Sequence, residues 1–383
     1  MFNNVKVNGM KYTAGLIGRS KENVEIGEVN GDSIIINASG PCSGGVLGAM
    51  ENGVIQNVEV EDSEIRGTDY VGGIVGSGGV RFGRMVSSEI EGKTYVGGVA
   101  GILNRATDEP SDQEFIVEKC KIFSAGSYLG GIAGYMNYGT QRCVVEGCLI
   151  EGTTVNADRV GGVAGYVVFS SIGKKVVKNT QIKSLGNDIG GIVGYFEAEV
   201  LLNGVFEDGF VEGTENVGGI VGSARELDVA VSYTNSLVKA TEKNAGGIIG
   251  YLKNAGMTAT INNSNLYYTY YANNKIQAPK NVGGLIGNIA EDLYTGGKYF
   301  YSNYVEAELE SEDPNTVSLG IGGRPDQNQG LIDCYYYQYS KINGENPNIE
   351  NEPFIEEEQY LKEADLKIQS TYNGKLGWST SYF

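Results

Sequence analysis

The sequence Val-Gly-Gly-Ile-Val-Gly at 71–76 returns along most of the chain and decides the fold. Successive copies are separated by as few as 25 residues (Gly73 to Gly98) and as many as 37 (Gly247 to Gly284). Repeats of roughly 20–50 residues are typical of solenoids, propellers and arrays, whose units bury their apolar faces against their neighbours. The second glycine of the block lies at Gly15, Gly45, Gly73, Gly98, Gly131, Gly162, Gly191, Gly219, Gly247 and Gly284.

A second pattern precedes each glycine block, as in EDSEIRG at 61–67 and VSSEIEG at 86–92. A small residue is followed two positions later by a large apolar one, with polar residues around them, which is the period-2 pattern of a half-buried strand. We interpret the two positions as inward-facing columns. The small column holds Ser63, Ser88, Cys120, Cys148, Thr180, Gly209, Ser236, Asn265, Asn303 and Cys334. The large column holds Ile65, Ile90, Ile122, Ile150, Ile182, Val211, Val238, Tyr267, Val305 and Tyr336.

The glycine block itself is interpreted as a second short strand, interrupted by paired glycines that mark a bend or a close backbone approach. Each unit then has two or three strands, and no unit contains a helical period of useful length. A propeller blade needs about 40 residues and four antiparallel strands. The sequence therefore predicts an all-β fold, a parallel β-solenoid (β-helix) of about ten coils stacked at about 4.8 Å.

The chain is expected to divide into three parts. Residues 1–342 form the solenoid, and the polar stretch 343–353 reads as a linker. Residues 354–383 are predicted to form a C-terminal cap with a short helix, because Tyr360, Leu361, Ala364 and Ile368 recur at helical spacing. Met1 is followed at once by a strand-like segment, so we expect the natural protein to continue upstream.

Composition limits the functions that the chain can serve. The net charge is −18, which opposes binding to nucleic acid and to anionic lipid surfaces. No apolar run is long enough to insert into a membrane. Five cysteines in 383 residues do not form a disulfide framework, and Cys120 and Cys148 are expected to be stacked, free and buried thiols.

The chain contains no histidine, so it lacks the commonest general base and the usual zinc ligand. No catalytic residue, metal site or cofactor is predicted, and no calcium-binding glycine–aspartate array is present. One enzymatic alternative stays open: a polysaccharide lyase or glycosidase can run on paired carboxylates. The candidate pairs are Glu61–Asp62, Glu89–Glu91 and Glu291–Asp292.

Tyrosines gather toward the C-terminal end, at 267–271, 299–304 and 335–339. Outward tyrosines in register could hold a sugar ring or a peptide, because tyrosine offers a large amphipathic contact area. The alternative is that they fill the core and form cross-strand pairs. The predicted ligand-binding residues are Tyr268, Tyr270, Tyr304, Tyr335 and Tyr337.

The glycine blocks between about residues 10 and 340 resemble the GLUG motif, a repeat found in large secreted or wall-anchored bacterial proteins. The segment 361–367 followed by Leu-Gly-Trp at 376–378 is similar to the ends of such repeat regions. GLUG repeats occur in adhesins, and upstream of the peptidase domain in the immunoglobulin A1-peptidase family of streptococcal zinc metallopeptidases. The resemblance implies an extracellular β-solenoid but not the peptidase activity, since the chain has no His-Glu-x-x-His motif.

Two hypotheses follow. In the preferred one, the chain is a non-catalytic structural or adhesive segment of a larger protein at the bacterial cell surface, continuous with further domains. Its partner would be a host glycan or a host protein. In the other, the chain is a carbohydrate-active β-helix enzyme that uses carboxylates.

Overall fold

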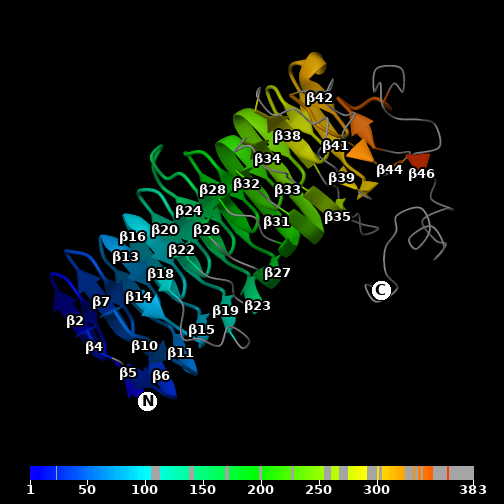
Figure 1. The fold of residues 1–383 in the computed structure, drawn as a ribbon. Helices are drawn as coiled ribbons and strands as arrows, with labels where there is room; N and C mark the ends of the chain where they lie inside the picture. Colours follow the sequence, from blue (N-terminus) through cyan, green and yellow to red (C-terminus); the bar gives the residue numbers. More distant parts are fainter. Residues whose placement is uncertain are drawn as a thin grey trace.

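The computed structural model describes residues 1–22, 24–104, 113–137, 142–168, 172–197, 201–225, 228–253, 260–266, 275–290, 300–301, 304–323, 331–332, 335–337, 340–347 and 360–361. The chain is an elongated parallel β-solenoid, and its coils follow one another in sequence order from one end to the other (Figure 1). Strands of successive coils pair in parallel, as in Ile65 opposite Ile90 and Ile90 opposite Ile122. The predicted fold class is confirmed.

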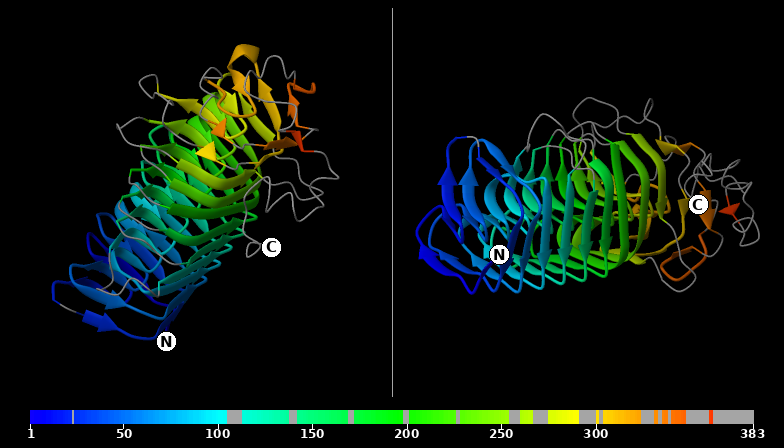
Figure 2. Two further views of the ribbon diagram at one scale, coloured as in Figure 1. Left: turned by 45° about the vertical axis from the view of Figure 1, so that its right-hand side comes forward. Right: turned by 90° about the horizontal axis from the view of Figure 1, so that it is seen from below.

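A regular coil has four short strands, one more than the sequence indicated, and equivalent strands of successive coils pair in four rows. The coils stack along the solenoid axis (Figure 2). The extra strand arises because the glycine block spans a corner. In one coil, β13 (Asp69–Gly72) ends in the first half of the block and β14 (Val75–Gly79) begins in the second half.

The rows are named here in the order in which a coil passes through them. The first row contains β1 (Phe2–Asn3), β6 (Val29–Asp32), β11 (Val58–Glu61), β15 (Phe82–Val86), β19 (Glu114–Glu118), β23 (Arg142–Glu146), β27 (Ile172–Lys178), β35 (Thr260–Leu266), β39 (Phe300–Tyr301), β40 (Tyr304–Val305), β43 (Leu331–Ile332), β44 (Tyr335–Tyr337) and β46 (Tyr360–Leu361). The second row contains β2 (Lys6–Gly9), β7 (Ile35–Ala38), β12 (Glu64–Arg66), β16 (Glu89–Gly92), β20 (Lys121–Ser124), β24 (Leu149–Gly152), β28 (Gln181–Ser184), β36 (Lys275–Ala278), β41 (Glu308–Ser311) and β45 (Lys341–Ile342).

The third row contains β3 (Thr13–Ala14), β8 (Ser43–Gly44), β13, β17 (Thr94–Gly97), β21 (Leu129–Gly130), β25 (Val160–Gly161), β29 (Ile189–Gly190), β37 (Val282–Gly283) and β42 (Val317–Ser318). The fourth row contains β4 (Ile17–Ser20), β9 (Leu47–Met50), β14, β18 (Ala100–Asn104), β22 (Ala133–Met136), β26 (Ala164–Val167), β30 (Val193–Phe196), β32 (Val221–Ala224), β34 (Ile249–Leu252) and β38 (Ile286–Ile289). The long strands β31 (Leu201–Gly218) and β33 (Asp228–Gly246) cross the first three rows. In the first coils, β5 (Val24–Ile26) pairs with β10 (Gly53–Ile55) in a separate two-stranded sheet.

The core is a set of ladders in which each buried side chain lies on its equivalent in the next coil. The isoleucine column of the second row is fully buried at Ile65, Ile90 and Ile122, as predicted. Stacked β-branched side chains suit this position because they pack well on a pleated surface.

The predicted columns are wrong in the last coils. Val238 pairs with Ile276, which pairs with Leu309, and this ladder ends at Ile342. Val305 and Tyr336 are instead backbone partners in β40 and β44 of the first row. Tyr267 lies outside the described residues. The prediction failed because both rows carry the same alternation, so a pattern of period 2 does not distinguish them.

The small column of the second row has a specific role. The Ser63 hydroxyl accepts a hydrogen bond from the Ile34 backbone N–H at 3.0 Å, and the Ser88 hydroxyl accepts one from Ser63 N–H at 3.0 Å. The Cys148 thiol likewise accepts a hydrogen bond from Cys120 N–H at 3.4 Å. A buried N–H that lacks a strand partner is satisfied in this way.

The end of the small column also differs from the prediction. Ser340 accepts from Ala307 N–H at 3.4 Å, so these two residues continue the small column. Asn265 pairs with Tyr304 in the first row, whereas Asn303 and Cys334 lie outside the described residues. Among the described residues, Cys42, Cys120, Cys143 and Cys148 are thiols and form no disulfide. The hydrogen bond to Cys148, together with burial, raises the pKa of Cys120, so this thiol stays protonated.

Glycine is required at the corner between the third and fourth rows because backbones meet there. A Cβ added to Gly131 would lie 2.1 Å from the carbonyl oxygen of Gly162 in the next coil. From Gly45 to Gly219, the second glycine of each block would meet the same clash at 2.0–2.3 Å. The ladder continues through this corner, since Gly98 N–H donates to Gly131 O at 3.0 Å. No side chain larger than hydrogen fits there.

The predicted C-terminal helix is not formed at the two residues of that segment that are described. Tyr360 and Leu361 form the short strand β46, which pairs in parallel with β44 through Tyr336 and Tyr337. Strand pairing outweighs the helical spacing here because β44 offers unpaired backbone groups. The remaining residues of 354–383 lie outside the described part. At the start of the predicted linker, Asn343 N–H donates to Leu309 O at 2.8 Å.

Helices are almost absent from the described residues, where the 3-10 turn η1 (Pro314–Thr316) is the one helical element. Within those residues, no helix is long and apolar enough to cross a lipid bilayer.

Replacing Ile122 by Asp places an unpaired carboxylate in the fully buried ladder. We expect this change to lower the free energy of unfolding by about 3–5 kcal/mol, because the charge has no partner in the core. Thermal and urea unfolding followed by circular dichroism measures the loss. The control is Lys121→Ser at the adjacent exposed position, and a stability of Ile122→Asp equal to this control would contradict the ladder.

Replacing Gly131 by Ala adds a methyl group at the corner. We expect a loss of about 1–3 kcal/mol, because the clash is with backbone that cannot rotate away. Gly27→Ala is the matched control, since a Cβ there meets nothing within 4 Å. Equal unfolding midpoints for the two alanine variants would show that the corner does not depend on glycine.

Candidate functional site

The residue immediately before each glycine block has a left-handed backbone. Its φ lies between 53° and 70° in every described coil from the first to the tenth. We call these positions the left-handed column. The column contains Tyr12, Cys42, Tyr70, Tyr95, Tyr128, Arg159, Asp188, Asn216, Asn244 and Asn281.

The side chains of this column change along the solenoid. Asparagine and aspartate tolerate the left-handed region, and they fill it in the last coils. There they form an amide ladder: Asn216 donates to Asp188 at 2.8 Å, Asn244 to Asn216 at 2.7 Å, and Asn281 to Asn244 at 2.6 Å. Bulky residues in this region cost about 1–3 kcal/mol each. The earlier coils nevertheless carry tyrosine or arginine at five of their six positions.

The tyrosines of the left-handed column form a stack along the solenoid axis. The ring centroids of Tyr70 and Tyr95 are 5.0 Å apart, and those of Tyr95 and Tyr128 are 4.5 Å apart with an interplanar angle of 9°. Arg159 occupies the next position. Its Nη1 donates to the Tyr128 hydroxyl at 2.9 Å.

A second file of tyrosines lies beside the first, on the outer face of the fourth row. Tyr135 of β22 pairs with Tyr166 of β26, and Tyr166 pairs with Tyr195 of β30. Their ring centroids are 5.3 Å and 5.4 Å apart. The two files touch, since Tyr95 meets Tyr135 at 6.2 Å and Tyr128 meets Tyr166 at 5.7 Å.

Arg159 joins the two files. Its guanidinium carbon lies 5.2 Å from the ring centroid of Tyr128, 5.0 Å from that of Tyr166 and 4.6 Å from that of Tyr195. A guanidinium over aromatic faces is held by the ring quadrupoles. We call this cluster the tyrosine–arginine surface. It comprises Tyr70, Tyr95, Tyr128, Tyr135, Arg159, Tyr166 and Tyr195.

The glycine corner brings the two files together. Gly134, which precedes Tyr135, packs so closely that an added Cβ would lie 2.6 Å from both the Tyr128 carbonyl oxygen and the Tyr95 carbonyl carbon. The same absence of a side chain that lets the coils stack therefore places the tyrosine after each block beside the tyrosine before it.

Electrostatics keep this surface protonated and cationic. Burial raises the pKa of Tyr95, Tyr135 and Tyr195, so these hydroxyls are hydrogen-bond donors at neutral pH. Among the described residues, no carboxylate pairs with Arg159. The neighbouring cations differ, because Arg225 pairs with Glu197 at 3.6 Å and Lys253 lies 3.7 Å from Asp188.

The binding residues predicted from the sequence are only partly described. Tyr304 of β40 and Tyr335 of β44 are paired neighbours, and Tyr337 pairs with Leu361. Tyr268 and Tyr270 lie outside the described residues, so these five positions stay a prediction. Sequence reasoning missed the tyrosine–arginine surface. The signal was a tyrosine directly before the block at 70, 95 and 128, and directly after it at 135, 166 and 195.

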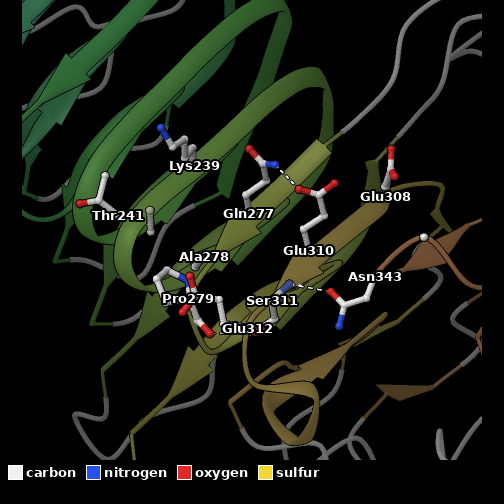
Figure 3. Close-up of a pocket in the computed structure, with 12 residues that line it drawn as sticks. Lys239, Thr241, Gln277, Ala278, Pro279, Glu308, Glu310, Ser311, Glu312 and Asn343 are labelled. Carbon is white, nitrogen blue, oxygen red and sulfur yellow. Dashed lines mark hydrogen bonds between the residues drawn. The ribbon is translucent and has the colours of Figure 1, made fainter.

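A groove near the C-terminal end contains carboxylates (Figure 3). It has a volume of about 660 Å³ and lies across β33, β36, β41 and the turn after β45. Glu308, Glu310 and Glu312 line it, and the Glu310 side chain points toward Gln277 and accepts its hydrogen bond. The ion pair with Lys275, at 2.5 Å, lowers the pKa of Glu310. A general acid in glycoside hydrolysis needs the opposite shift.

The carboxylate pairs named from the sequence lie on the outer surface or beyond the described part. Glu89 and Glu91 both accept from Arg66, at 2.8 Å and 3.1 Å. Glu61 and Asp62 are exposed, and residues 291–292 are not described. Within the described ranges, no three side chains of aspartate, glutamate or cysteine are placed to hold a metal ion.

One buried cation was also missed. Lys175 is fully buried in the first row and faces Cys143 of the preceding coil. Burial lowers the pKa of Lys175, while the contact with the Cys143 thiol opposes that shift. The pair lies inside the solenoid and has no access to a substrate.

Comparisons with known proteins give two partial similarities. The chain is 28% identical over 159 residues to an immunoglobulin A1 protease of Streptococcus pneumoniae (strain ATCC BAA-255 / R6), covering 40% of this chain. It is 26% identical over 145 residues to an immunoglobulin A1 protease of Streptococcus sanguinis, covering 36% of this chain. The match spans 8% of the length of each relative. No family model and no solved structure matches the chain.

Replacing Tyr95 by Asn tests whether the tyrosine stack stabilises the fold. Lost ring stacking costs about 0.5–1.5 kcal/mol for each contact, while relief of the left-handed backbone returns about 1–3 kcal/mol. We expect the two terms to offset, so the free energy of unfolding changes by less than about 1 kcal/mol. Denaturant unfolding measures the change. A loss above about 3 kcal/mol would show that the stack is a structural element.

Proposed function

We propose that this chain is a non-catalytic segment of a larger bacterial protein exposed at the cell surface, where it is a rigid spacer with a recognition surface. The host-derived partner is a glycan or a protein. The observation that carries the proposal is the tyrosine–arginine surface, where costly residues occupy left-handed positions that asparagine fills in later coils. Strain retained in this way is a sign of selection for the side chain itself.

The solenoid supports the spacer part of the proposal. The backbone ladder runs through the described coils without a gap in the fourth row, where ten strands pair in sequence. Such a stack resists bending, because each coil is hydrogen-bonded to both neighbours. The lateral surface is also stabilised by ion pairs between coils, such as Arg84 with Glu59 and Glu118.

The comparisons support the proposed location at the bacterial cell surface. The chain is similar to a short segment of two streptococcal proteins named as immunoglobulin A1 proteases, and that name gives a host protein as their substrate. The resemblance of the glycine blocks to GLUG repeats is in line with this reading. The chain lacks histidine, so we assign no peptidase activity to it.

A carbohydrate-active enzyme is the second candidate, and the groove at Glu308, Glu310 and Glu312 favours it. Two carboxylates flanking a sugar could protonate and attack a glycosidic bond. The lowered pKa of Glu310 and its ion pair with Lys275 support a structural role instead. We therefore keep the non-catalytic segment as the proposal.

Glycan and host-protein arrays test the proposal with three proteins: wild type, Tyr95→Asn/Tyr166→Ser, and Tyr268→Ser/Tyr337→Ser. We expect wild-type signal on at least one ligand, reduced at least tenfold by the first pair of changes. Loss of binding only in the Tyr268→Ser/Tyr337→Ser variant would place the binding site at the C-terminal tyrosines. Absence of any ligand, or cleavage of a polysaccharide that stops in Glu308→Gln, would contradict the proposal.

A further inference from the structure

The tyrosine–arginine surface offers hydrogen-bond donors more than ring faces. Tyr95 is stacked on one side by Tyr70 and on the other by Tyr128, so both of its faces are covered. A neutral sugar ring or a proline-rich peptide needs an open aromatic face or a groove between faces. At Tyr95 the stack leaves instead the ring edge that carries the hydroxyl.

Arg159 supplies the charge of this surface. A guanidinium has five N–H donors, and the structure assigns a single hydrogen bond to this one, from Nη1 to the Tyr128 hydroxyl. Because no carboxylate of the described residues pairs with it, the rest of the fork is available to a ligand. Its planar geometry matches a carboxylate in two parallel hydrogen bonds. The strongest contact on this surface is therefore one to an anion.

The hydroxyls extend the donor array along the solenoid. Arginine can only donate, so the Tyr128 oxygen accepts from Arg159 and the Tyr128 hydroxyl keeps its own proton to donate. That Tyr128 proton is available to an acceptor on the ligand. A ligand that fits has a carboxylate and, a few ångströms away, neutral oxygen acceptors.

The backbone around the surface excludes pairing with an acidic peptide strand. Val96 N–H donates to Tyr128 O at 2.9 Å, and Leu129 N–H donates to Arg159 O at 3.1 Å. Backbone groups of the third row are thus used between coils, and strand addition needs free ones. An extended polymer that binds through side groups alone fits the array better.

We propose that the tyrosine–arginine surface binds an acidic polysaccharide, with a uronic-acid carboxylate on Arg159 and hydroxyl or ring oxygens on the tyrosine hydroxyls. This inference rests on the proposed recognition function and specifies its ligand class. The net charge of −18 repels polyanions in general. Binding is therefore local to this cation, and it recognises the sugar as well as the charge.

Isothermal titration calorimetry of the intact chain with octagalacturonate tests the inference. The matched probe is the same octamer with every carboxyl methyl-esterified, and poly-glutamate is the polyanion control. We expect binding of octagalacturonate that is at least tenfold tighter than binding of either control. Equal affinity for the esterified octamer, equal affinity for poly-glutamate, or no binding to octagalacturonate would overturn the inference.

Two variants locate the site. Arg159→Asn keeps a residue that tolerates the left-handed backbone, so it should fold, and we expect at least tenfold weaker binding. Arg142→Gln removes an exposed arginine of the first row that pairs with Glu114, and should stay within twofold of wild type. Unchanged binding by folded Arg159→Asn would overturn the inference.

The array experiment distinguishes failure of the acidic-ligand inference from failure of the proposed recognition function. A neutral glycan or a host protein that binds wild type but not Tyr95→Asn/Tyr166→Ser would retain the recognition function and reject the acidic ligand.

Discussion

The structure depends on the approach of glycine backbones at the corner between the third and fourth rows. At Gly98, Gly131 and Gly162, the Cα of one coil lies against the carbonyl of the next, leaving no room for a Cβ. This contact lets the hydrogen-bond ladder turn the corner without a break, and it holds successive coils in one register. The isoleucine ladder, the small column that caps buried N–H groups, and the tyrosine files are all consequences of that register.

The same corner accounts for the site. The residue before the block must take a left-handed backbone for the chain to enter the turn, and the third glycine of the block packs against the preceding coil. These two requirements place tyrosines from before and after the block side by side. Later coils meet the backbone requirement with asparagine, which forms a ladder of its own. The change from Tyr128 and Arg159 to Asp188 and Asn216 marks where the aromatic surface gives way to an amide one.

Much of this fold could be predicted from the sequence, because a glycine block that recurs with an alternating strand leaves few architectures. The columns from Ser63 to Ser236 and from Ile65 to Val238 were predicted correctly. The columns of the last coils were predicted wrongly, because strands of the first and second rows alternate apolar and polar residues in the same way. Tyr336 of the first row therefore fitted the predicted large column as well as Ile342 of the second row did. The helix expected near Tyr360 failed at the described residues because an adjacent strand edge was available to pair with it. The tyrosine–arginine surface required knowledge that positions before and after the block meet in space, which periodicity within one strand cannot provide.

Hydrogen exchange of the native chain tests the central role of the corner most directly. The amides of Gly98 and Gly131 donate across it, to Gly131 O at 3.0 Å and Gly161 O at 3.3 Å. We predict that these glycine amides exchange as slowly as the amide of Ile122 in the buried second row, since both would open only with the whole stack. Exchange of the glycine amides at the rates of exposed turns, while Ile122 stays protected, would contradict the account.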